Sequence, residues 1–333
     1  MTEIACYVHG AFPRSEALVA ATRDADRGRR SAVPVDEQRA LDRADFLALQ
    51  AETGLDYRSI GWLGWADLFR PLVAATAGLA TGPLTRWFDT NTFFRAPVLT
   101  GADLVLDRTA FGAAAGLTAA GLTAGGLTAG AATEASQVAM LPGPYTFSRL
   151  AEPDTDRDAL MPRLARDVLK PAAEELRAAG AELLQLQEPA LVTRPVAAGS
   201  WPYLAQAVRI VAADLGCRVV VHTYYGDAGP VLDRLRELPV DAVGVDLTET
   251  DLESLRGSWQ TGLLAGCLDG RSSGLEDVDA TAALASRIVE TARPPLLLLS
   301  SAGDLELVPR TVAEEKVRVL GAATRRLREE LAC

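Results

Sequence analysis

The chain has 333 residues, 49% of them hydrophobic, and a formal net charge of −11. This length suits one large α/β barrel, so we expect a single domain over residues 1–333. The acidic balance argues against nucleic acid or an anionic membrane surface as a partner, because phosphates are bound by basic surfaces. The four cysteines form no CxxC pair, and no basic segment followed by an apolar run opens the chain. We therefore expect reduced thiols, no membrane association and a cytoplasmic location.

Short apolar segments alternate with helical patterns along the chain. Each apolar segment ends in glycine, proline or a polar residue, as buried parallel strands do. Eight such strands separated by helices predict a (β/α)8 barrel with its functional groups at the carboxyl ends of the strands. The expected strands cover 3–8, 55–60, 138–141, 182–186, 218–221, 242–245, 263–268 and 295–299. The expected helices cover 35–53, 65–79, 158–179, 201–215, 231–238 and 311–331.

Residues 85–135 interrupt this alternation. The part 87–107 has extended character, and the part 116–130 repeats the motif Gly-Leu-Thr-Ala with small variations. Side chains that small do not build a core, so we expect a low-complexity helix or surface segment there. The whole region is predicted to be an excursion from the barrel.

The fifth expected strand carries the clearest candidate for chemistry. Three valines run into His222 and then Tyr224, and the chain has only two histidines. An imidazole at a strand exit can act as a general acid or base near neutral pH. The alternative is a buried histidine with satisfied partners. His9 follows the first strand on the same side of the barrel, and its alternative is a histidine that packs a loop.

Two acidic side chains follow other strands. Glu188 precedes Pro189, and Asp246 ends the sixth strand. A carboxylate in such a place must be solvated, paired or functional, so ligand binding and a structural ion pair both stay open. Tyr224 either donates a hydrogen bond or fills space. The catalytic candidates are therefore His222, Glu188, Asp246 and Tyr224.

Other side chains at the strand exits are candidates for substrate binding. Trp62 and Trp65 share one exit loop, where they either pack in the core or stack on a flat ligand. Asp269 can instead pair with Arg271 close by in the chain. The predicted set for a small-molecule substrate is His9, Arg14, Trp62, Asn91, Tyr145, Gln187 and Asp269.

These exits resemble, in order, the cobalamin-independent methionine synthase family. The resemblance implies a TIM barrel of the methionine synthase and uroporphyrinogen decarboxylase type, and a methyl- or alkyltransferase of one-carbon metabolism. The segments that carry it lie at 10–14, 54–56, 87–91, 143–146, 187–191, 222–227, 269–271 and 301–303.

The resemblance also implies a zinc site, and the sequence departs from it. The family holds zinc through a His-x-Cys pair, a glutamate and a second cysteine. His222 matches the histidine, whereas Tyr224, Asp246 and Ala302 stand at the other three positions. Because cysteine thiolates supply much of the affinity for zinc, we expect no metal ligands and little bound zinc. No cofactor is certain, and a methyl donor such as methyltetrahydrofolate remains possible.

The family's homocysteine pocket is also altered. Gln187 stands where the resemblance implies an aspartate, and Trp62 stands where it implies a glutamate. Both acids would hold the substrate ammonium group. We therefore expect transfer of a methyl or other small carbon group to a small molecule other than homocysteine. Two alternatives stay open, namely a zinc-dependent methyltransferase with shifted ligands and a non-catalytic ligand-binding or scaffold barrel.

Overall fold

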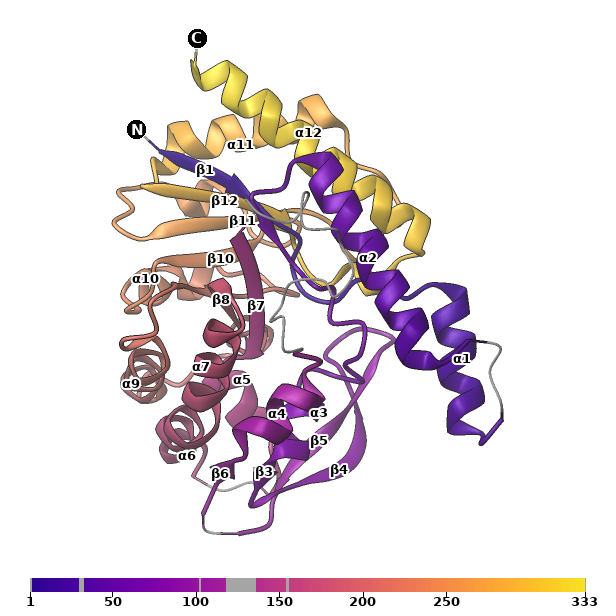
Figure 1. Ribbon diagram of the computed structural model, residues 1–333. Coiled ribbons are helices and arrows are strands. Elements are labelled where there is room, and N and C mark those ends of the chain that lie inside the picture. Colours follow the sequence, from indigo (N-terminus) through magenta and orange to yellow (C-terminus); the bar gives the residue numbers. More distant parts are fainter. Residues whose placement is uncertain (1, 30–32, 102, 118–135, 154–155, 333) are drawn as a thin grey trace.

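Eight parallel strands form the centre of the protein (Figure 1). The computed structural model describes residues 2–29, 33–101, 103–117, 136–153 and 156–332. The strands pair in the order β1-β12-β11-β10-β9-β8-β7-β2, which confirms a (β/α)8 barrel. Their bounds are β1 (Glu3–Cys6), β2 (Tyr57–Arg58), β7 (Ser136–Pro142), β8 (Ala181–Gln187), β9 (Arg218–His222), β10 (Ala242–Asp246), β11 (Gly262–Leu268) and β12 (Leu296–Ser301).

The barrel is closed at β1 and β2 by a side chain. The amide of Asp56, just before β2, donates to the carbonyl of Cys6 at 3.1 Å. In return the amide of Cys6 donates to the Asp56 carboxylate at 2.8 Å. Arg328 holds the same carboxylate at 2.7 Å. The first and last parts of the described chain therefore meet at one seam.

Apolar side chains fill the lower part of the barrel interior. One fully buried cluster contains Tyr7, just after β1, and one residue from each of four further strands: Leu183, Val220, Leu264 and Leu298. Because both faces of each strand are covered, the strands are continuously apolar and do not alternate with polar residues. The polar side chains begin one layer higher, at the carboxyl ends of the strands.

Helices surround the strands on the outside (Figure 1). The predicted helix 158–179 is observed as α6, a π-helical turn η1 and α7 in succession. Within the described residues, no helix combines the length and apolar character needed to cross a membrane. The longer helices are α1 (Glu16–Asp26), α2 (Val35–Thr53), α6 (Arg157–Leu164), α7 (Lys170–Ala178), α9 (Ser200–Ala212), α11 (Val278–Ala292) and α12 (Arg310–Ala332). The shorter ones are α3 (Arg70–Ala75), α4 (Arg108–Ala114), α5 (Pro144–Leu150), α8 (Ala190–Thr193), α10 (Leu232–Arg236), η1 (Ala165–Leu169), η2 (Gly229–Val231), η3 (Leu252–Leu255) and η4 (Leu305–Leu307).

The predicted helix over 65–79 is wrong in most of its length. Asp67 Oδ1 accepts from the amides of Phe69 and Arg70, so the helix begins only at Arg70. It ends at Ala75 because β3 (Thr76–Ala77) pairs with β6 (Val105–Leu106). Apolar spacing alone did not reveal this competing strand pair.

The expected excursion is a β-hairpin that projects from the barrel (Figure 1). It consists of β4 (Leu79–Arg86) and β5 (Phe93–Leu99). Its inner side chains Trp87 and Phe94 are buried, so the hairpin packs on the barrel mouth. The low-complexity repeat lies mostly at 118–135, outside the described residues.

The contact between α12 and the end of α2 generates a stability prediction. A Cβ on Gly321 would lie 2.3 Å from the carbonyl oxygen of Thr53, which is backbone and cannot move aside cheaply. We expect Gly321→Ala to lower the free energy of unfolding in urea by roughly 1–3 kcal/mol. Gly112→Ala is the matched control, since nothing lies within 4 Å of its added Cβ. That control should be neutral or stabilising by about 0.5–1 kcal/mol, and equal losses in both variants would contradict the tight contact.

Candidate functional site

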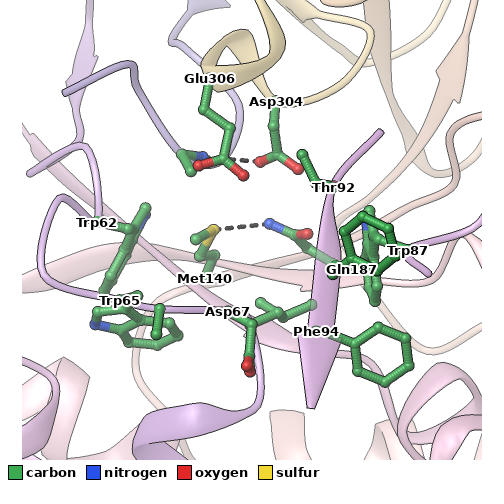
Figure 2. Close-up of a pocket in the computed structure, with 14 residues that line it drawn as sticks. Trp62, Trp65, Asp67, Trp87, Thr92, Phe94, Met140, Gln187, Asp304 and Glu306 are labelled. Carbon is green, nitrogen blue, oxygen red and sulfur yellow. Dashed lines mark hydrogen bonds between the residues drawn. The ribbon is translucent and has the colours of Figure 1, made fainter. Parts of the chain in front are cut away.

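A small pocket lies at the carboxyl ends of the strands (Figure 2). Trp62 and Trp65 form one wall, with ring centroids 4.6 Å apart. Trp87 and Phe94, from the hairpin, form the facing wall at 5.4 Å from each other. About 60 Å³ between the walls is open to water-sized molecules. The pocket is therefore sized for a small chemical group.

The loop that carries Trp62 is conformationally strained. Trp62 has φ 52°, in the left-handed region that bulky side chains rarely adopt. Such a residue costs of order 1–3 kcal/mol and persists only where its surroundings hold it. The carbonyl of Gly61 accepts from the amide of Phe12, and Trp65 Nε1 donates to the carbonyl of Ala115. These contacts hold the indole wall in place.

Two carboxylates close the top of the pocket in Figure 2. Asp304 Oδ1 accepts from the amide of Ala11 at 2.8 Å. Burial raises the pKa of Asp304 to about 7, and the negative charge of Glu306 acts in the same direction. The protein around the Glu306 carboxylate also raises its pKa by desolvation, although the residue lies at the exposed rim, and Arg14 opposes this shift.

Gln187 forms the floor of the pocket with Met140. Its Nε2 donates to the Met140 sulfur at 2.7 Å, and its Oε1 accepts from the Tyr224 hydroxyl at 2.5 Å. Both Gln187 and Tyr224 are buried. Burial raises the pKa of Tyr224 well above its ordinary value, so the hydroxyl stays protonated as the donor. The amide is thereby fixed in one orientation.

Behind the floor, a chain of hydrogen bonds connects the two histidines. The Tyr7 hydroxyl donates to Gln185 Oε1 at 2.7 Å, and Gln185 Nε2 lies 2.5 Å from His9 Nδ1. His9 Nδ1 lies 2.8 Å from His222 Nδ1. All four side chains are buried. Burial lowers the pKa of His9 to about 3 and that of His222 well below its ordinary value, so both rings are neutral at pH 7.

The donors in this chain assign the histidine tautomers. Because the Gln185 amide donates to His9 Nδ1, the proton of neutral His9 resides on Nε2. That atom lies 3.7 Å from Asp304 Oδ1 and has no hydrogen-bond partner. His222 Nδ1 lies 2.8 Å from the same His9 nitrogen, and His222 Nε2 is buried and also without a partner. The barrel therefore holds one imidazole N–H near Asp304 and a second imidazole nitrogen that has no hydrogen-bond partner.

Glu188 faces the start of α5. Its two oxygens accept from the amides of Tyr145 and Thr146 at 2.8 and 2.6 Å. A Cβ on Gly143 would lie 2.1 Å from the Glu188 carboxyl carbon, so the Gly-Pro-Tyr-Thr loop needs glycine there. Burial raises the pKa of Glu188 to about 7 despite these two bonds. Its carboxylate is thus occupied by backbone donors.

Asp246 is engaged in a similar way. It accepts from the amide and hydroxyl of Thr248 at 2.9 and 2.6 Å and from the amide of Tyr225 at 3.2 Å. Burial raises its pKa, and the bonds to Thr248 act against that shift. The side chain ties together the loops that follow β9 and β10.

The other predicted residues are spread around the mouth. Trp62 and Gln187 line the pocket described above. Asn91 accepts from exposed Arg86 and lines a neighbouring groove, and Arg14 lies in a shallow exposed groove. Asp269 accepts from the amide of Arg271 at 2.8 Å, as its alternative interpretation predicts. The structure brings His9, His222, Tyr224 and Gln187 together, but not Arg14, Asn91 or Asp269.

A second, wider cleft lies between the hairpin and the start of α5. It offers about 840 Å³ to water-sized molecules and includes Tyr145 and Tyr225 among its lining residues. Arg149 stacks on the Tyr145 ring at 4.4 Å and pairs with Asp158 at 2.5 Å. The cleft is basic, because four arginines and one aspartate line it: Arg86, Arg149, Arg157, Arg194 and Asp89.

The side chains at the implied zinc positions do not form a zinc donor set. The Tyr224 hydroxyl donates to Gln187, and both Asp246 oxygens accept from neighbouring loop groups. Ala302 has no donor atom, which leaves the Nε2 of His222 as one available nitrogen. Zinc in proteins takes four ligands, or three and a water. These four positions therefore do not fit the family's metal.

The pocket contains functional groups that sequence reasoning did not select. Asp304 and Glu306 lie in the loop after β12, and Trp87, Met140 and Phe94 complete the walls and floor. The acid after the Ser-Ser-Ala-Gly exit was visible in the sequence as a further strand exit. The sequence does not show that this acid is buried, because Ala11 is remote in the chain and Glu306 is exposed.

Comparison with known proteins identifies the family. A family model described as "Cobalamin-independent synthase, N-terminal domain" matches residues 75–293. A homocysteine methyltransferase of Corynebacterium glutamicum, named for 5-methyltetrahydropteroyltriglutamate, is 30% identical over 286 residues. That match covers 83% of this chain and 35% of the relative. An enzyme of the same name from Streptomyces avermitilis is 31% identical over 231 residues, covering 66% and 28%. The chain therefore belongs to the cobalamin-independent methionine synthase family.

Two further facts define the relationship. The chain spans about a third of the length of the curated relatives it matches. Among solved structures, a B12-independent methionine synthase from Shewanella has TM-score 0.69 at 16% identity, over 99% of this chain and 98% of that one. A putative enzyme of that type from Listeria monocytogenes has TM-score 0.66 at 13% identity, over 99% of each chain. At these identities the two structures confirm the fold.

The contacts of Glu188 generate a prediction about its role. Glu188→Gln replaces one acceptor oxygen by an NH2 group that faces a backbone N–H, so we expect a loss of roughly 1–3 kcal/mol in unfolding free energy. Exposed Glu329→Gln is the matched control and should change little. Urea unfolding measures both. Unchanged stability of Glu188→Gln would show that the bonds from Tyr145 and Thr146 to this carboxylate do not hold the start of α5 in place.

The raised pKa of Asp304 generates a pH prediction. In the folded protein Asp304 keeps its proton up to about pH 7, whereas the ordinary pKa of an aspartate is 3.8. Ionisation of this group therefore lowers the unfolding free energy as the pH rises from about 4 to about 7. Asparagine cannot ionise and can still accept from Ala11. We expect Asp304→Asn to raise the unfolding free energy by roughly 1–3 kcal/mol at pH 8 and by less at pH 5. Exposed Asp26→Asn is the control, and an equal effect at both pH values would contradict the assignment.

Proposed function

We propose that this protein transfers a methyl or other small carbon group to a small molecule other than homocysteine, without the family's zinc. The observation that carries the proposal is the small pocket at the strand exits, with two indole walls, a fixed amide floor and Asp304. Active sites of TIM barrels lie at this face. Family membership supports methyl transfer as the reaction class.

Asp304 is the residue we assign to proton transfer. The acceptor's lone pair forms the new bond to the methyl carbon, and the bond between that carbon and the donor breaks with its electron pair remaining on the donor. The acceptor's proton passes to the Asp304 carboxylate. A pKa of about 7 suits this role near neutral pH. The N–H of His9, directed at Asp304, favours the carboxylate form before transfer.

The basic cleft supports an anionic methyl donor. The matched relatives are named for a donor with three glutamate residues. Four arginines beside two tyrosine rings provide positive charge and a flat apolar surface, which suits a ring system with a carboxylate tail. We infer that this cleft holds the donor and that the small pocket holds the acceptor. Both partners are then small molecules, and His222, Tyr224 and Gln187 position the pocket floor.

One alternative has an observation in its favour. The matching family model describes an N-terminal domain, and the carboxylates of Glu188 and Asp246 are occupied by loop amides and hydroxyls. A barrel that binds a ligand without reacting would show the same two features. Methyl transfer from methyltetrahydrofolate to any small acceptor separates the two proposals, because a scaffold barrel would bind without turnover.

The pocket generates a prediction about homocysteine. Gln187 and Trp62 carry no charge for its ammonium group, and no basic residue among the described lining residues would pair with its carboxylate. Charge-assisted bonds contribute roughly 1.5–3 kcal/mol each. We expect binding about 100-fold weaker or more than that of the Corynebacterium relative, measured side by side by calorimetry. Micromolar binding, or methionine formed from methyltetrahydrofolate, would mean that the ordinary family activity survives.

Metal content provides a second readout on the same preparation. We expect less than about one zinc per five chains, since the thiolate ligands are absent. The double variant Tyr224→Cys with Ala302→Cys introduces thiols at the two positions where the resemblance implies cysteines. This variant should bind more zinc. Stoichiometric zinc in the unmodified protein, removed only by strong chelators, would favour the zinc-dependent alternative.

A further inference from the structure

The small pocket combines aromatic walls with negative charge. Trp62 and Trp65 face Trp87 across the space, and Asp304 and Glu306 close the top (Figure 2). Indole faces carry negative electrostatic potential and attract cations within about 6 Å of the ring centroid. The two carboxyl groups add negative charge at the same place once they are ionised. Both features favour a positively charged ligand.

The basic residue that acts on these carboxylates, Arg14 near Glu306, lies outside the lining of the pocket. Among the described residues that line it, none is lysine, arginine or histidine. Asp67, the third acid of the lining, is already paired with Arg70 at 3.1 Å and points away from the floor in Figure 2. The remaining charges belong to Asp304 and Glu306.

A buried polar atom points at the same carboxylate. His9 is fully buried, and its Nε2 lies 3.7 Å from Asp304 Oδ1 without a hydrogen-bond partner. Because His9 is neutral, it adds a dipole and no charge. Asp304, whose side chain is only 13% exposed, is thus held by the amide of Ala11, with the neutral His9 ring nearby and no basic residue opposite it among the described lining residues.

The space sets the size of the ligand group. With roughly 10–15 Å³ needed for each water-sized occupant, about 60 Å³ accommodates about four to six such atoms. A trimethylammonium group has four heavy atoms and a dimethylsulfonium group has three. Methylated cations also have a low desolvation cost, because they donate no strong hydrogen bonds to water. A primary ammonium group would need acceptors on several sides, and Gln187 directs its amide oxygen at Tyr224.

We propose that this pocket binds a small methylated cation, an ammonium or sulfonium head group, held between Trp62 and Trp87 beneath Asp304 and Glu306. The inference rests on the proposed function only in taking this cation as the methylated product formed in the acceptor pocket. An amino acid is disfavoured, since no basic lining residue would pair with its carboxylate. The ammonium and sulfonium sources share one chemistry and are separated by the probes below.

The test compares choline with 3,3-dimethylbutan-1-ol, in which a neutral carbon replaces the charged nitrogen at the same shape. Calorimetry on the full chain should show choline bound at least 10-fold more tightly. Glu306→Gln should weaken choline binding about 5-fold or more and leave the neutral alcohol unchanged. Trp62→Leu should weaken both, choline more. Exposed Glu329→Gln should change neither, and circular dichroism checks that each variant is folded.

Further probes identify the head group and the competing interpretation. The affinities of tetramethylammonium and trimethylsulfonium show whether nitrogen or sulfur is preferred. The proposal is also supported if either of these cations binds more tightly than choline. Equal binding of choline and its neutral analogue, no binding of any cation, or tighter binding of methionine than of choline would each overturn it. Binding is measured without turnover, so the two experiments are independent. If no cation binds, the methyl-transfer assay still tests the proposed function. If no methyl group is transferred, the calorimetry still tests cation binding.

Discussion

The imidazole of His222 fits inside the barrel because Gly244 on β10 has no side chain. A Cβ there would lie 2.6 Å from the ring carbon Cδ2. This contact makes room for the chain of polar side chains that runs from His222 through His9 to Gln185. Were the ring displaced, His9 would lose the neighbour whose ring centroid lies 4.6 Å from its own. A glycine in the middle of a strand therefore makes room for the histidine pair beneath the mouth.

Much of the architecture could be predicted from the sequence, because parallel strands buried on both faces are continuously apolar and end in recognisable exits. The Gly-Pro-Tyr-Thr exit and the Gln-Glu-Pro exit were both identified this way. Their mutual contact was not, since the clamp between Glu188 and the amides of Tyr145 and Thr146 joins segments over 40 residues apart. Sequence patterns locate a carboxylate at a strand end without showing which donors reach it.

The site residues show the same limit, because those at strand ends could be selected from the sequence and the one buried by distant contacts could not. His222, Tyr224 and Gln187 were selected by their position at strand ends, and they do lie together. Asp304 was overlooked because its burial involves the loop of Ala11, whose amide donates to it from a distant part of the chain. The error over 65–79 has a related cause, since Asp67 caps the helix late and β3 pairs with β6. Tertiary contacts overrode local periodicity in both cases.

The carboxylates show how the fold assigns different roles to one type of side chain. Glu188 and Asp246 are buried with backbone donors aimed at them, so they stabilise loops. Asp304 is buried beside a cavity with one amide donor and a second acid nearby, and burial raises its pKa to about 7. A buried group with unmet electrostatic demand at a concave surface is where ligand recognition is expected.

The seam between β1 and β2 has a mechanical consequence. Strand pairing runs continuously from β1 through β12 to β2, whereas the seam is held by Asp56, its bonds to Cys6 and the guanidinium of Arg328. The loops leaving the two edge strands carry Ala11 and Trp62, and Phe12 donates to Gly61 between them. The pocket therefore straddles the seam, where β1 and β2 are joined by side-chain and loop contacts and not by a strand ladder. Any change in the spacing of these two strands would alter the gap between Ala11 and the indole wall, so the seam contacts also set the width of the pocket.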